Sequence, residues 1–537
     1  MSDITLFKID GKEYEAQKDE TIWQVAKKNG IDIPHLCYSD EPGYRADGNC
    51  RACMVEIKGE RTLAASCIRK PTEGMEITVN SKRAEKSRSM VFELLVADQP
   101  SKKDSPDPES KFWNWSDKLG LAESRFPSKE KISLDRSHKA MSVNLDACIN
   151  CGLCVRACRE VQVNDVIGMA FRGSTAKVIF DLDDRMGEST CVACGECVQA
   201  CPTGALSEST LVEESGKRNE IVADKKVESV CPYCGVGCQT EVSVKDDKII
   251  KIDGKNGPAN ENRLCVKGRF GFDYINHEGR ITKPLIRKKD APKQWDIRID
   301  DKNIYDYFEE TTWENALEIS ANGLKKTLNE EGPKGLAGFG SAKCSNEEAY
   351  LFQKLVRVGF GSNNVDHCTR LCHASSVAAL FEGLKSGAVS APFNAATVAD
   401  CIIVIGARPT ENHPVAATYL KRASKRGSKL IVMDPRKQGL TKYADHHLQF
   451  KPGTDVAMLN AMLHTIIEEE LYDKQYVQGQ TEGFEELKES IKDFSPEKME
   501  SICGIKAETL KDVARIYATS EKSIIFWGMG VSQHVHG

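Results

Sequence analysis

Four cysteines near the middle of the chain give the first indication of its chemistry. Cys231, Cys234, Cys238 and Cys265 follow the spacing C-x2-C-x3-C-x26-C, and glycines between them let the backbone curl tightly. Four thiolates spaced in this way can hold a [4Fe–4S] cluster. Structural zinc is the alternative, because zinc also binds four cysteines through C-x2-C pairs. We call these four cysteines the proximal quartet.

Two further cysteine runs repeat one pattern upstream. Each reads C-x2-C-x2-C-x3-C, and together they contain Cys148, Cys151, Cys154, Cys158, Cys191, Cys194, Cys197 and Cys201. This pattern is typical of bacterial two-cluster ferredoxins, in which the fourth cysteine of each run ligates the other cluster. It predicts one [4Fe–4S] cluster on the first crossed quartet (Cys148, Cys151, Cys154, Cys201) and another on the second crossed quartet (Cys158, Cys191, Cys194, Cys197). Zinc is a remote alternative here.

A fourth set, the N-terminal quartet, contains Cys37, Cys50, Cys53 and Cys67 with the spacing C-x12-C-x2-C-x13-C. Before it come a strand pair turning at Asp10-Gly11 and a short helix that a Thr21/Gln24 capping box would begin and Gly30 would end. This layout resembles the plant-type ferredoxin domain, a β-grasp fold with a [2Fe–2S] cluster. Zinc is again the alternative reading of the four thiols.

Composition limits the class of protein. A chain of 537 residues should hold three or more domains, and 40% hydrophobic with 28% charged residues describes a soluble globular protein. The net charge of −5 argues against nucleic acid or an anionic membrane as the main partner. No apolar run reaches membrane-spanning length and no signal peptide is apparent, so we expect a cytoplasmic protein. There, 21 cysteines indicate metal centres rather than disulfides.

Other elements must position these cysteines. Residues 81–97 predict an amphipathic helix with Met90, Val91, Leu94 and Leu95 on its apolar side and a solvated basic side. Residues 99–111 read as a linker, and a hairpin is expected around residues 246–247. Phe112, Trp113 and Trp115 follow the linker and should pack against a neighbouring domain.

The second half of the chain has a different pattern. Short apolar runs at 335–341, 401–406, 429–434 and 523–528 alternate with helical stretches, which predicts a parallel, doubly wound sheet. Such sheets bind ligands at the carboxyl ends of their strands. The segments expected there are Gly340-Ser341, Gly406-Ala407-Arg408, Asp434-Pro435-Arg436, Lys451-Pro452-Gly453-Thr454-Asp455 and Gly528-Met529-Gly530. Together they suit a large dinucleotide-like ligand, whereas no G-x-G-x-x-G or P-loop motif points to an ordinary NAD or ATP site.

Cys401 and Cys503 read as core residues, and the Cys372-His373 pair alone would by default be a buried pair. From about residue 224 onward, however, the chain resembles the catalytic subunit of molybdenum- or tungsten-dependent formate dehydrogenases. The shared motifs are CPYCGVGC, LCVKGRFG, NNVDHCTRLCH, HPVA, DPRK and FWGMGVSQ. These enzymes belong to the molybdopterin oxidoreductases, which bind two molybdopterin guanine dinucleotides. The front 210 residues resemble the extension of soluble NAD-linked formate dehydrogenases and the large iron–sulfur subunit of respiratory NADH:quinone oxidoreductase.

The resemblance implies roles for particular residues. Cys372 would be the thiolate ligand of the metal, His373 the adjacent acid/base or orienting residue, and Lys267 the lysine between the proximal cluster and the pterin. The other cofactor contacts expected are Gly340, Gly406, Asp434, Arg436, Gly453, Asp455, Gly528, Met529 and Gln533.

The implied reaction is oxidation of formate to CO2. The implied cofactors are one [2Fe–2S] cluster, three [4Fe–4S] clusters and a bis-molybdopterin guanine dinucleotide with molybdenum or tungsten. Electrons would pass along the clusters to NAD- and flavin-binding subunits of the diaphorase type.

The sequence departs from this family in two places. Many long front extensions carry a further cluster where this chain reads Asp98-Gln99-Pro100-Ser101, so that cluster should be absent. The family also continues past Gly537 with a second active-site arginine and a further domain, so we expect this chain to be a fragment. The domains expected are residues 1–80 ([2Fe–2S]), 81–138 (helical linker), 139–215 (two [4Fe–4S]), 224–285 (proximal [4Fe–4S]) and 286–537 (molybdopterin-binding α/β, incomplete).

Three alternative functions are weighed against formate oxidation. They are an electron-transfer subunit of the NADH:quinone oxidoreductase type, another molybdopterin enzyme such as a cysteine-ligated nitrate reductase, and a non-catalytic iron–sulfur scaffold or redox sensor. The Cys372-His373 pair and the run of nucleotide-binding loops argue against the first. The NNVDHCTRLCH context and the NAD-type front end favour formate over the second, and the third would leave the pterin loops unexplained. The sequence does not choose between molybdenum and tungsten, between the two directions of reaction, or between proton and hydride transfer.

Overall fold

The computed structural model describes residues 4–535 and 537. The chain divides into two compact units. The first comprises the chain up to Cys231, Gly235–Gly271 and His413–Arg422, and the second comprises Pro232–Cys234, Phe272–Asn412 and Ala423–Gly537. Each unit is described by itself.

The first unit begins with a five-stranded mixed sheet of strand order β2-β1-β5-β3-β4. Its strands are β1 (Thr5–Ile9), β2 (Lys12–Ala16), β3 (Met54–Ile57), β4 (Ala64–Ala65) and β5 (Glu76–Thr78). The predicted hairpin is present, with positive φ at both Asp10 and Gly11 as a tight two-residue turn requires. Helix α1 (Ile22–Lys28) begins with the predicted capping box of Thr21 and Gln24. β1 pairs with β2 antiparallel but with β5 parallel, as in a β-grasp fold.

Helix α2 (Lys82–Ala97) was predicted correctly, but its predicted apolar side was only partly right, since Leu95 packs against the core whereas Leu94 does not. It buries Ala84, Arg88, Phe92 and Val96, while Leu94 is 49% exposed. Arg88 is buried because its guanidinium donates to the carbonyls of Met54 (2.8 Å) and Val79 (2.5 Å). An arginine on the supposedly solvated side therefore anchors the helix to the sheet.

The residues predicted to link the domains are followed by helix α3 (Lys111–Lys118). Phe112 and Trp113 on α3 are buried against Phe92 of α2 and against Leu36 and Ala52 of the β-grasp domain. The aromatic residues thus pack α3 onto the neighbouring domain, as expected.

The rest of the first unit is built from small sheets and short helices around cysteine loops. The two-cluster region contains β6 (Met141–Val143) paired with β9 (Leu206–Glu208), β7 (Ile167–Ala170) paired with β8 (Lys177–Phe180), and helices α4 (Leu153–Arg156) and α5 (Glu196–Ala200). It is followed by the antiparallel sheet of β10 (Lys225–Val230), β11 (Gln239–Lys245) and β12 (Lys248–Gly254), then helix α6 (Val266–Phe270). The β11–β12 hairpin was predicted, whereas β10 was not.

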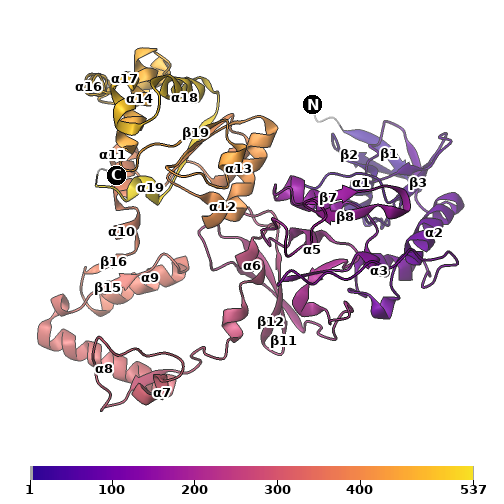
Figure 1. Ribbon diagram of the computed structural model, residues 1–537, viewed down its shortest axis with the longest axis horizontal. Coiled ribbons are helices and arrows are strands. Elements are labelled where there is room, and N and C mark those ends of the chain that lie inside the picture. Colours follow the sequence, from indigo (N-terminus) through magenta and orange to yellow (C-terminus); the bar gives the residue numbers. More distant parts are fainter. Residues whose placement is uncertain (1–3, 536) are drawn as a thin grey trace. The chain divides into compact units, whose positions relative to one another are not determined.

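The second unit contains a four-stranded parallel sheet of order β19-β18-β17-β20. Its strands are β17 (Cys401–Ile405), β18 (Lys429–Met433), β19 (His446–Leu448) and β20 (Ser523–Trp527). Helices α14 (Asp455–Glu468), α17 (Pro496–Cys503) and α18 (Ala507–Thr519) pack together (Figure 1). Met458, Met462 and Leu510 of these helices join Ile403 and Met433 of the strands in one buried core.

The expectation of one sheet for all four apolar runs was wrong for the first run. β15 (Gly338–Gly340) pairs in parallel with β16 (Val365–His367) in a separate two-stranded sheet. Helix α9 (Asn346–Lys354) lies between these strands in sequence and returns the chain beside β15. A complete β–α–β crossover is thereby formed locally, and β15 takes no partner from the larger sheet.

The remaining elements of the second unit connect these sheets or flank them. They are β13 (Leu285–Arg287), β14 (Phe308–Glu310), α7 (Ile304–Tyr307), α8 (Trp313–Glu331), α10 (Thr369–Cys372), α11 (Ala374–Leu384), α12 (Pro409–Asn412), α15 (Lys474–Gln480), α16 (Phe484–Ser490) and α19 (Met529–Ser532), while α13 (Pro414–Arg426) is divided between the units. Among the described residues, no helix is both long and apolar enough to cross a membrane.

Candidate functional site

The N-terminal quartet lies in a loop that folds its thiols toward one another. Cys37, Cys53 and Cys67 are buried and Cys50 is half-buried. The amide of Cys37 donates to Sγ of Cys50 (3.4 Å), and that of Cys50 donates to Sγ of Cys37 (3.5 Å). Hydrogen bonds from the thiols of Cys50 and Cys67 hold the pKa of Cys37 far below the usual range for a thiol. The same hydrogen bonds raise the pKa of Cys50 and of Cys67, so these thiols lie close enough to share one thiolate and, by the same closeness, to hold iron together.

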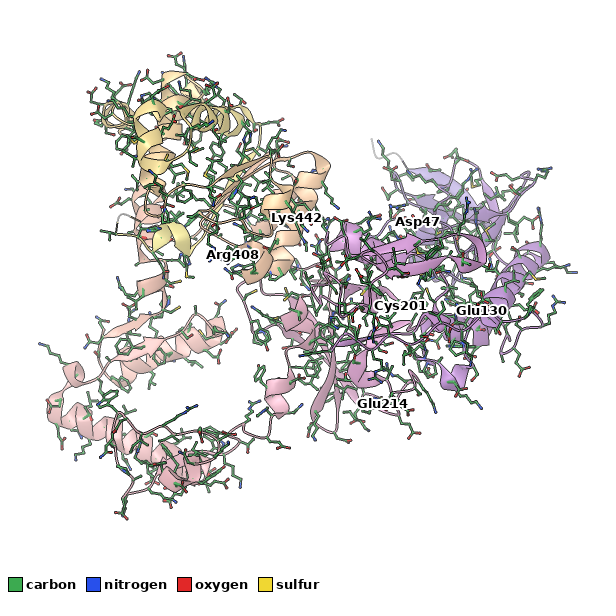
Figure 2. The ribbon with its side chains drawn as sticks, in the orientation of Figure 1. Asp47, Glu130, Cys201, Glu214, Arg408 and Lys442 are labelled. Atoms are coloured by element: carbon green, nitrogen blue, oxygen red, sulfur yellow. The ribbon has the colours of Figure 1, made fainter. Side chains whose placement is uncertain are left out.

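The first crossed quartet lines one enclosed cavity. Cys148, Cys151 and Cys154 of the first run border it together with Cys201 of the second run. Residues 47 positions or more apart in sequence are thus brought to one site, which is the arrangement that crossed ligation requires. Cys201 is labelled in Figure 2.

The second crossed quartet also joins cysteines of both runs, because Cys158 and Cys197 are buried in one apolar cluster and Cys191 packs against it. Burial, and then the nearby Cys158, raise the pKa of Cys194 to about 12. Burial and the neighbouring thiols of Cys194 and Cys191 raise the pKa of Cys197 well above its ordinary value. Negative charge on several neighbouring thiols is unfavourable without a cation between them, and an iron cluster supplies that positive charge.

Three members of the proximal quartet lie together in the first unit. Cys231, Cys238 and Cys265 share a small apolar cluster with Leu264 and other residues, and the amide of Cys231 donates to the carbonyl of Cys238 (2.8 Å). Cys234 is assigned to the second unit, so its membership of this quartet stays a prediction from the spacing. Lys267 is exposed and lies two residues after Cys265, at the start of α6. The pKa of the His413 imidazole is lowered, mainly by burial and also by the positive charge of Lys267.

A buried hydrogen-bonded chain links the loops that carry these quartets. The Tyr44 hydroxyl donates to Glu196 Oε1 (3.0 Å), and the Gln162 side-chain amide donates both to Glu196 Oε2 (3.3 Å) and to the carbonyl of Leu264 (3.1 Å). Tyr44 lies near Cys50, Glu196 lies between Cys194 and Cys197, and Leu264 precedes Cys265. The cysteine sites of the first unit are therefore held in one packed body.

Arg269 reinforces this linkage. Its buried guanidinium donates to the carbonyl of Cys194 (2.9 Å) and to Gln199 (2.8 Å). A Cβ atom on Gly195, which has φ +68°, would lie only 2.1 Å from Cδ of Arg269. Only a glycine at position 195 leaves room for the Arg269 side chain to pass beside the loop that carries Cys194 and Cys197. Arg269 was not identified from the sequence, since a lone arginine four residues after a cysteine forms no recognisable pattern.

Among the described residues, no three His, Cys, Asp or Glu side chains meet as closely as a single bound metal ion requires. The assignment of clusters therefore rests on which cysteines the fold brings together, on their spacing and on the family matches reported below.

In the second unit, Cys372 and His373 lie at the junction of α10 and α11, against the segment that follows β20. Sγ of Cys372 is 3.2 Å from Sδ of Met529, and Nδ1 of His373 is 3.2 Å from Oγ of Ser532. The side-chain amide of Gln533 donates to the carbonyl of Leu371 (2.8 Å). Four residues singled out from the sequence, Cys372, His373, Met529 and Gln533, are thus brought together across more than 150 positions of chain.

Two glycine loops meet beside this segment, at the carboxyl ends of β17 and β20. The amide of Gly530 donates to the carbonyl of Gly406 (3.0 Å). A Cβ atom on Gly406 would lie 2.8 Å from the backbone of Gly530 and Val531, and one on Gly528 would lie 2.6 Å from the carbonyl of Gly406. The close backbone contact excludes side chains at these positions and leaves an edge of exposed peptide groups, as dinucleotide sites require.

Buried polar atoms without a hydrogen bond lie at the same end of the sheet, and one of them, Oδ2 of Asp455, is 3.6 Å from Nε2 of His534. Oγ1 of Thr410, Oε1 of Gln438 and both carboxylate oxygens of Asp455 are buried without a hydrogen bond. Asp455 follows β19, and burial raises its pKa. Asp434, by contrast, accepts from the amide of Arg436 (2.9 Å) and from Gln438 (3.1 Å). Buried polar atoms are normally satisfied, so these orphans fit a polar ligand such as the base and ribose of a dinucleotide.

The predicted contacts do not all lie at this sheet. Gly340 lines a cavity of about 880 Å³ at the carboxyl end of β15, bordered also by Ser341, Cys344, Tyr350 and His367. Gly453 has φ +81° in the turn before α14, and a Cβ atom added there would meet no atom beyond its chain neighbours within 4 Å. Arg408, labelled in Figure 2, follows β17 and forms an ion pair with Glu411 (3.2 Å). Thr410 and Gln438 were missed from sequence because neither carries a motif of its own.

Four family descriptions match successive parts of the chain. They are a 2Fe-2S iron-sulfur cluster binding domain (residues 3–82), a 4Fe-4S dicluster domain (147–205), a molybdopterin oxidoreductase Fe4S4 domain (224–277) and molybdopterin oxidoreductase (280–537). The chain carries the domains of a molybdopterin oxidoreductase. The expected fold class, a multidomain α/β and α+β protein with a β-grasp [2Fe–2S] domain, a two-cluster domain and molybdopterin domains, is confirmed.

Curated relatives agree with these domains. The chain is 32% identical over 574 residues to the "Putative formate dehydrogenase YrhE" of Bacillus subtilis, covering 99% of this chain and 56% of the relative. It is 42% identical over 314 residues to the "F420-dependent formate dehydrogenase subunit alpha" of Methanocaldococcus jannaschii, covering 58% of this chain and 44% of the relative. The chain thus spans about half the length of the curated relatives it matches.

Among solved structures, this chain is similar to acetylene hydratase from Pelobacter acetylenicus. The TM-score is 0.50 at 28% identity, covering 58% of this chain and 41% of the other.

Proposed function

We propose that this chain is part of the catalytic subunit of a molybdopterin formate dehydrogenase, which oxidises formate to CO2. The observation that carries the proposal is the contact of Cys372 with Met529 and of His373 with Ser532, in a chain whose relatives include proteins named formate dehydrogenase. Electrons would leave through the cysteine quartets of the first unit.

The donor set of the second unit fits a bis-molybdopterin guanine dinucleotide that carries molybdenum or tungsten. Cys372 would supply a soft thiolate ligand to the metal, since metal-bound cysteines are deprotonated. Gly406, Gly528 and Gly530 would admit the cofactor close to the backbone, and the unsatisfied carboxylate of Asp455 would accept hydrogen bonds from its base. When bound, this cofactor supplies the two-electron chemistry that no side chain provides.

His373 would handle the proton or orient formate. Its Nδ1 lies at Ser532 Oγ, and Ser532 also contacts Ser376, which accepts from Trp527 Nε1 (2.9 Å). This network fixes the imidazole ring through Nδ1 and leaves Nε2 for the substrate. Positioning by a packed network is what acid–base catalysis requires.

The first unit would then act as the electron path. Three [4Fe–4S] clusters and one [2Fe–2S] cluster on the four quartets would carry electrons singly, with the N-terminal quartet nearest an acceptor. An NAD- and flavin-binding subunit of the diaphorase type is the partner we propose, on the resemblance of the front extension to NAD-linked formate dehydrogenases.

The test uses the protein loaded with iron and cofactor. Cys372→Ala should abolish formate-dependent dye reduction while iron content stays at the wild-type level, because Cys372 belongs to none of the quartets. Cys368→Ala is the matched control, since Cys368 is exposed, lies one helical turn away and has no predicted role. His373→Ala should lower kcat by about 10²–10⁴-fold.

Near-normal formate oxidation by Cys372→Ala would refute the proposed metal ligand. Metal analysis separates the other functions. Purified protein with iron but neither molybdenum nor tungsten would indicate an electron-transfer subunit, whereas a metal-loaded protein that turns over nitrate but not formate would indicate a different molybdopterin reaction.

A further inference from the structure

One arginine connects the N-terminal quartet to the first crossed quartet. Arg156 ends helix α4 and is 2% exposed. Its Nη2 donates to the carbonyl of Cys37 (2.5 Å) and reaches the carbonyl of Cys151 (3.5 Å). Cys37 belongs to the N-terminal quartet and Cys151 to the first crossed quartet, so one guanidinium contacts the backbone of both.

The two quartets are in direct contact around this residue. Cys37 and Cys151 are buried in one apolar cluster with Leu153, and Cys50 packs against it. Because residues of both loops are buried in this one cluster, a charge placed here acts on both sites through a medium of low dielectric constant.

Hydrogen bonding alone does not explain the arginine. Asn49 already bridges the same loops, because it precedes Cys50 and its side-chain amide donates to the carbonyl of Cys151 (3.2 Å). A neutral side chain can therefore make this link. Burying the charged guanidinium of Arg156 costs free energy, because the charge is removed from water. A charged side chain at this position therefore needs an explanation other than the hydrogen bond.

The charges near Arg156 balance in number, with two cations and two anions, but they differ in position. Its Nη1 forms an ion pair with Asp47, which is labelled in Figure 2. Asp47 also pairs with Arg45, an exposed residue that contacts Glu160 (3.0 Å) as well. Arg156 is the cation of this group that reaches the cysteine carbonyls, whereas Arg45 lies at the surface.

We propose that Arg156 is a positioning residue that raises the reduction potentials of the [2Fe–2S] cluster and of the adjoining [4Fe–4S] cluster and holds the two together as a relay pair. With both clusters bound, transfer between them would move one electron from the reduced [4Fe–4S] cluster to the oxidised [2Fe–2S] cluster and would require no proton. Each reduced cluster carries one more negative charge, which a buried cation stabilises. This inference rests on the proposed cluster loading and not on formate as the substrate.

The test is an anaerobic redox titration of the cluster-loaded protein, followed by EPR of the [2Fe–2S] signal. Arg156→Gln should shift this midpoint to a more negative potential, with a change of about tenfold in the ratio of oxidised to reduced cluster, equivalent to about 59 mV for one electron. Arg156→Lys should retain most of the wild-type value, because it keeps the charge. Asp47→Asn should shift the midpoint in the opposite direction, because it removes the compensating anion.

Arg45→Gln is the matched control, since it removes one positive charge next to the same aspartate but at the surface, where water and salt screen it. Its midpoint should stay close to that of the wild type. A wild-type midpoint in Arg156→Gln with full iron content, or an equal shift in Arg45→Gln, would overturn the proposal.

If Arg156→Gln fails to hold its clusters, Asp47→Asn decides the matter, because an unchanged or more negative midpoint in that variant contradicts the proposed electrostatics. Absence of a [2Fe–2S] signal from the wild type would refute the cluster assignment and this inference together. Loss of formate turnover with the predicted shifts intact would refute only the proposed substrate.

Discussion

Replacing Gly406 by alanine should disturb both the sheet and the candidate site. Gly406 has φ +58°, a left-handed conformation that costs an alanine about 1–2 kcal/mol. The added Cβ would also lie 2.8 Å from backbone atoms of Gly530 and Val531. Backbone atoms cannot rotate away as a side chain can, so overpacking of this kind adds about 1–3 kcal/mol. The total expected loss in free energy of unfolding is therefore about 2–5 kcal/mol.

The consequence for function follows from what the displaced segment carries. Met529 contacts Cys372, and Gln533 donates to the carbonyl of Leu371. Moving this segment away from Gly406 should pull it from the Cys372 loop. We therefore expect Gly406→Ala to lose formate turnover and molybdenum or tungsten content in addition to stability.

Urea unfolding, with hydrogen exchange of peptides from β17 and β20, measures the loss. Gly483→Ala is the matched control, because Gly483 also has a left-handed conformation (φ +76°) but only the distant tip of Glu486 lies within reach of a Cβ atom. Gly483→Ala should lose only the stability that the left-handed backbone conformation costs an alanine. Any stabilisation that comes from a less flexible unfolded chain is the same in both variants. Equal losses in the two variants, with metal content unchanged in both, would refute the argument from backbone contact.

Three further predictions concern other parts of the chain. Iron and sulfide analysis of fully loaded protein should give about 14 iron atoms per chain, which corresponds to one [2Fe–2S] and three [4Fe–4S] clusters. Zinc in place of much of this iron would contradict the prediction. Arg88→Met should leave the carbonyls of Met54 and Val79 without this donor and destabilise the N-terminal domain by about 1–3 kcal/mol. The [2Fe–2S] absorbance should then be lost at a lower temperature, and an unchanged midpoint temperature would contradict the prediction. Burial raises the pKa of Asp455 above its unfolded value, so cofactor-free wild type loses stability as pH rises through the folded pKa. Asp455→Asn should then be the more stable protein at neutral pH but not at acidic pH by urea unfolding, and it should load less cofactor.

The sequence predicted best those features that depend on residues close together in the chain. The Asp10-Gly11 hairpin, the Thr21/Gln24 capping box and the helix at residues 82–97 depend on neighbours in the chain, and all three are present. The cysteine runs predicted iron–sulfur domains for the same reason, because ligands a few residues apart need only a curled backbone between them. The matching family descriptions agree with those domains.

The tertiary structure decided what depends on residues far apart in sequence. The side of α2 that is buried follows from the carbonyls of Met54 and Val79 that Arg88 reaches, and no periodicity in the helix reveals them. β15 is not part of the four-stranded sheet, because the β–α–β crossover that follows it supplies β16 as its partner strand. The meeting of Cys372 with Met529, and of Arg156 with Cys37, joins positions more than 100 residues apart. The sequence named the chemical groups, whereas packing alone determined which of them touch, because a contact's energy depends on distance in space and not along the chain.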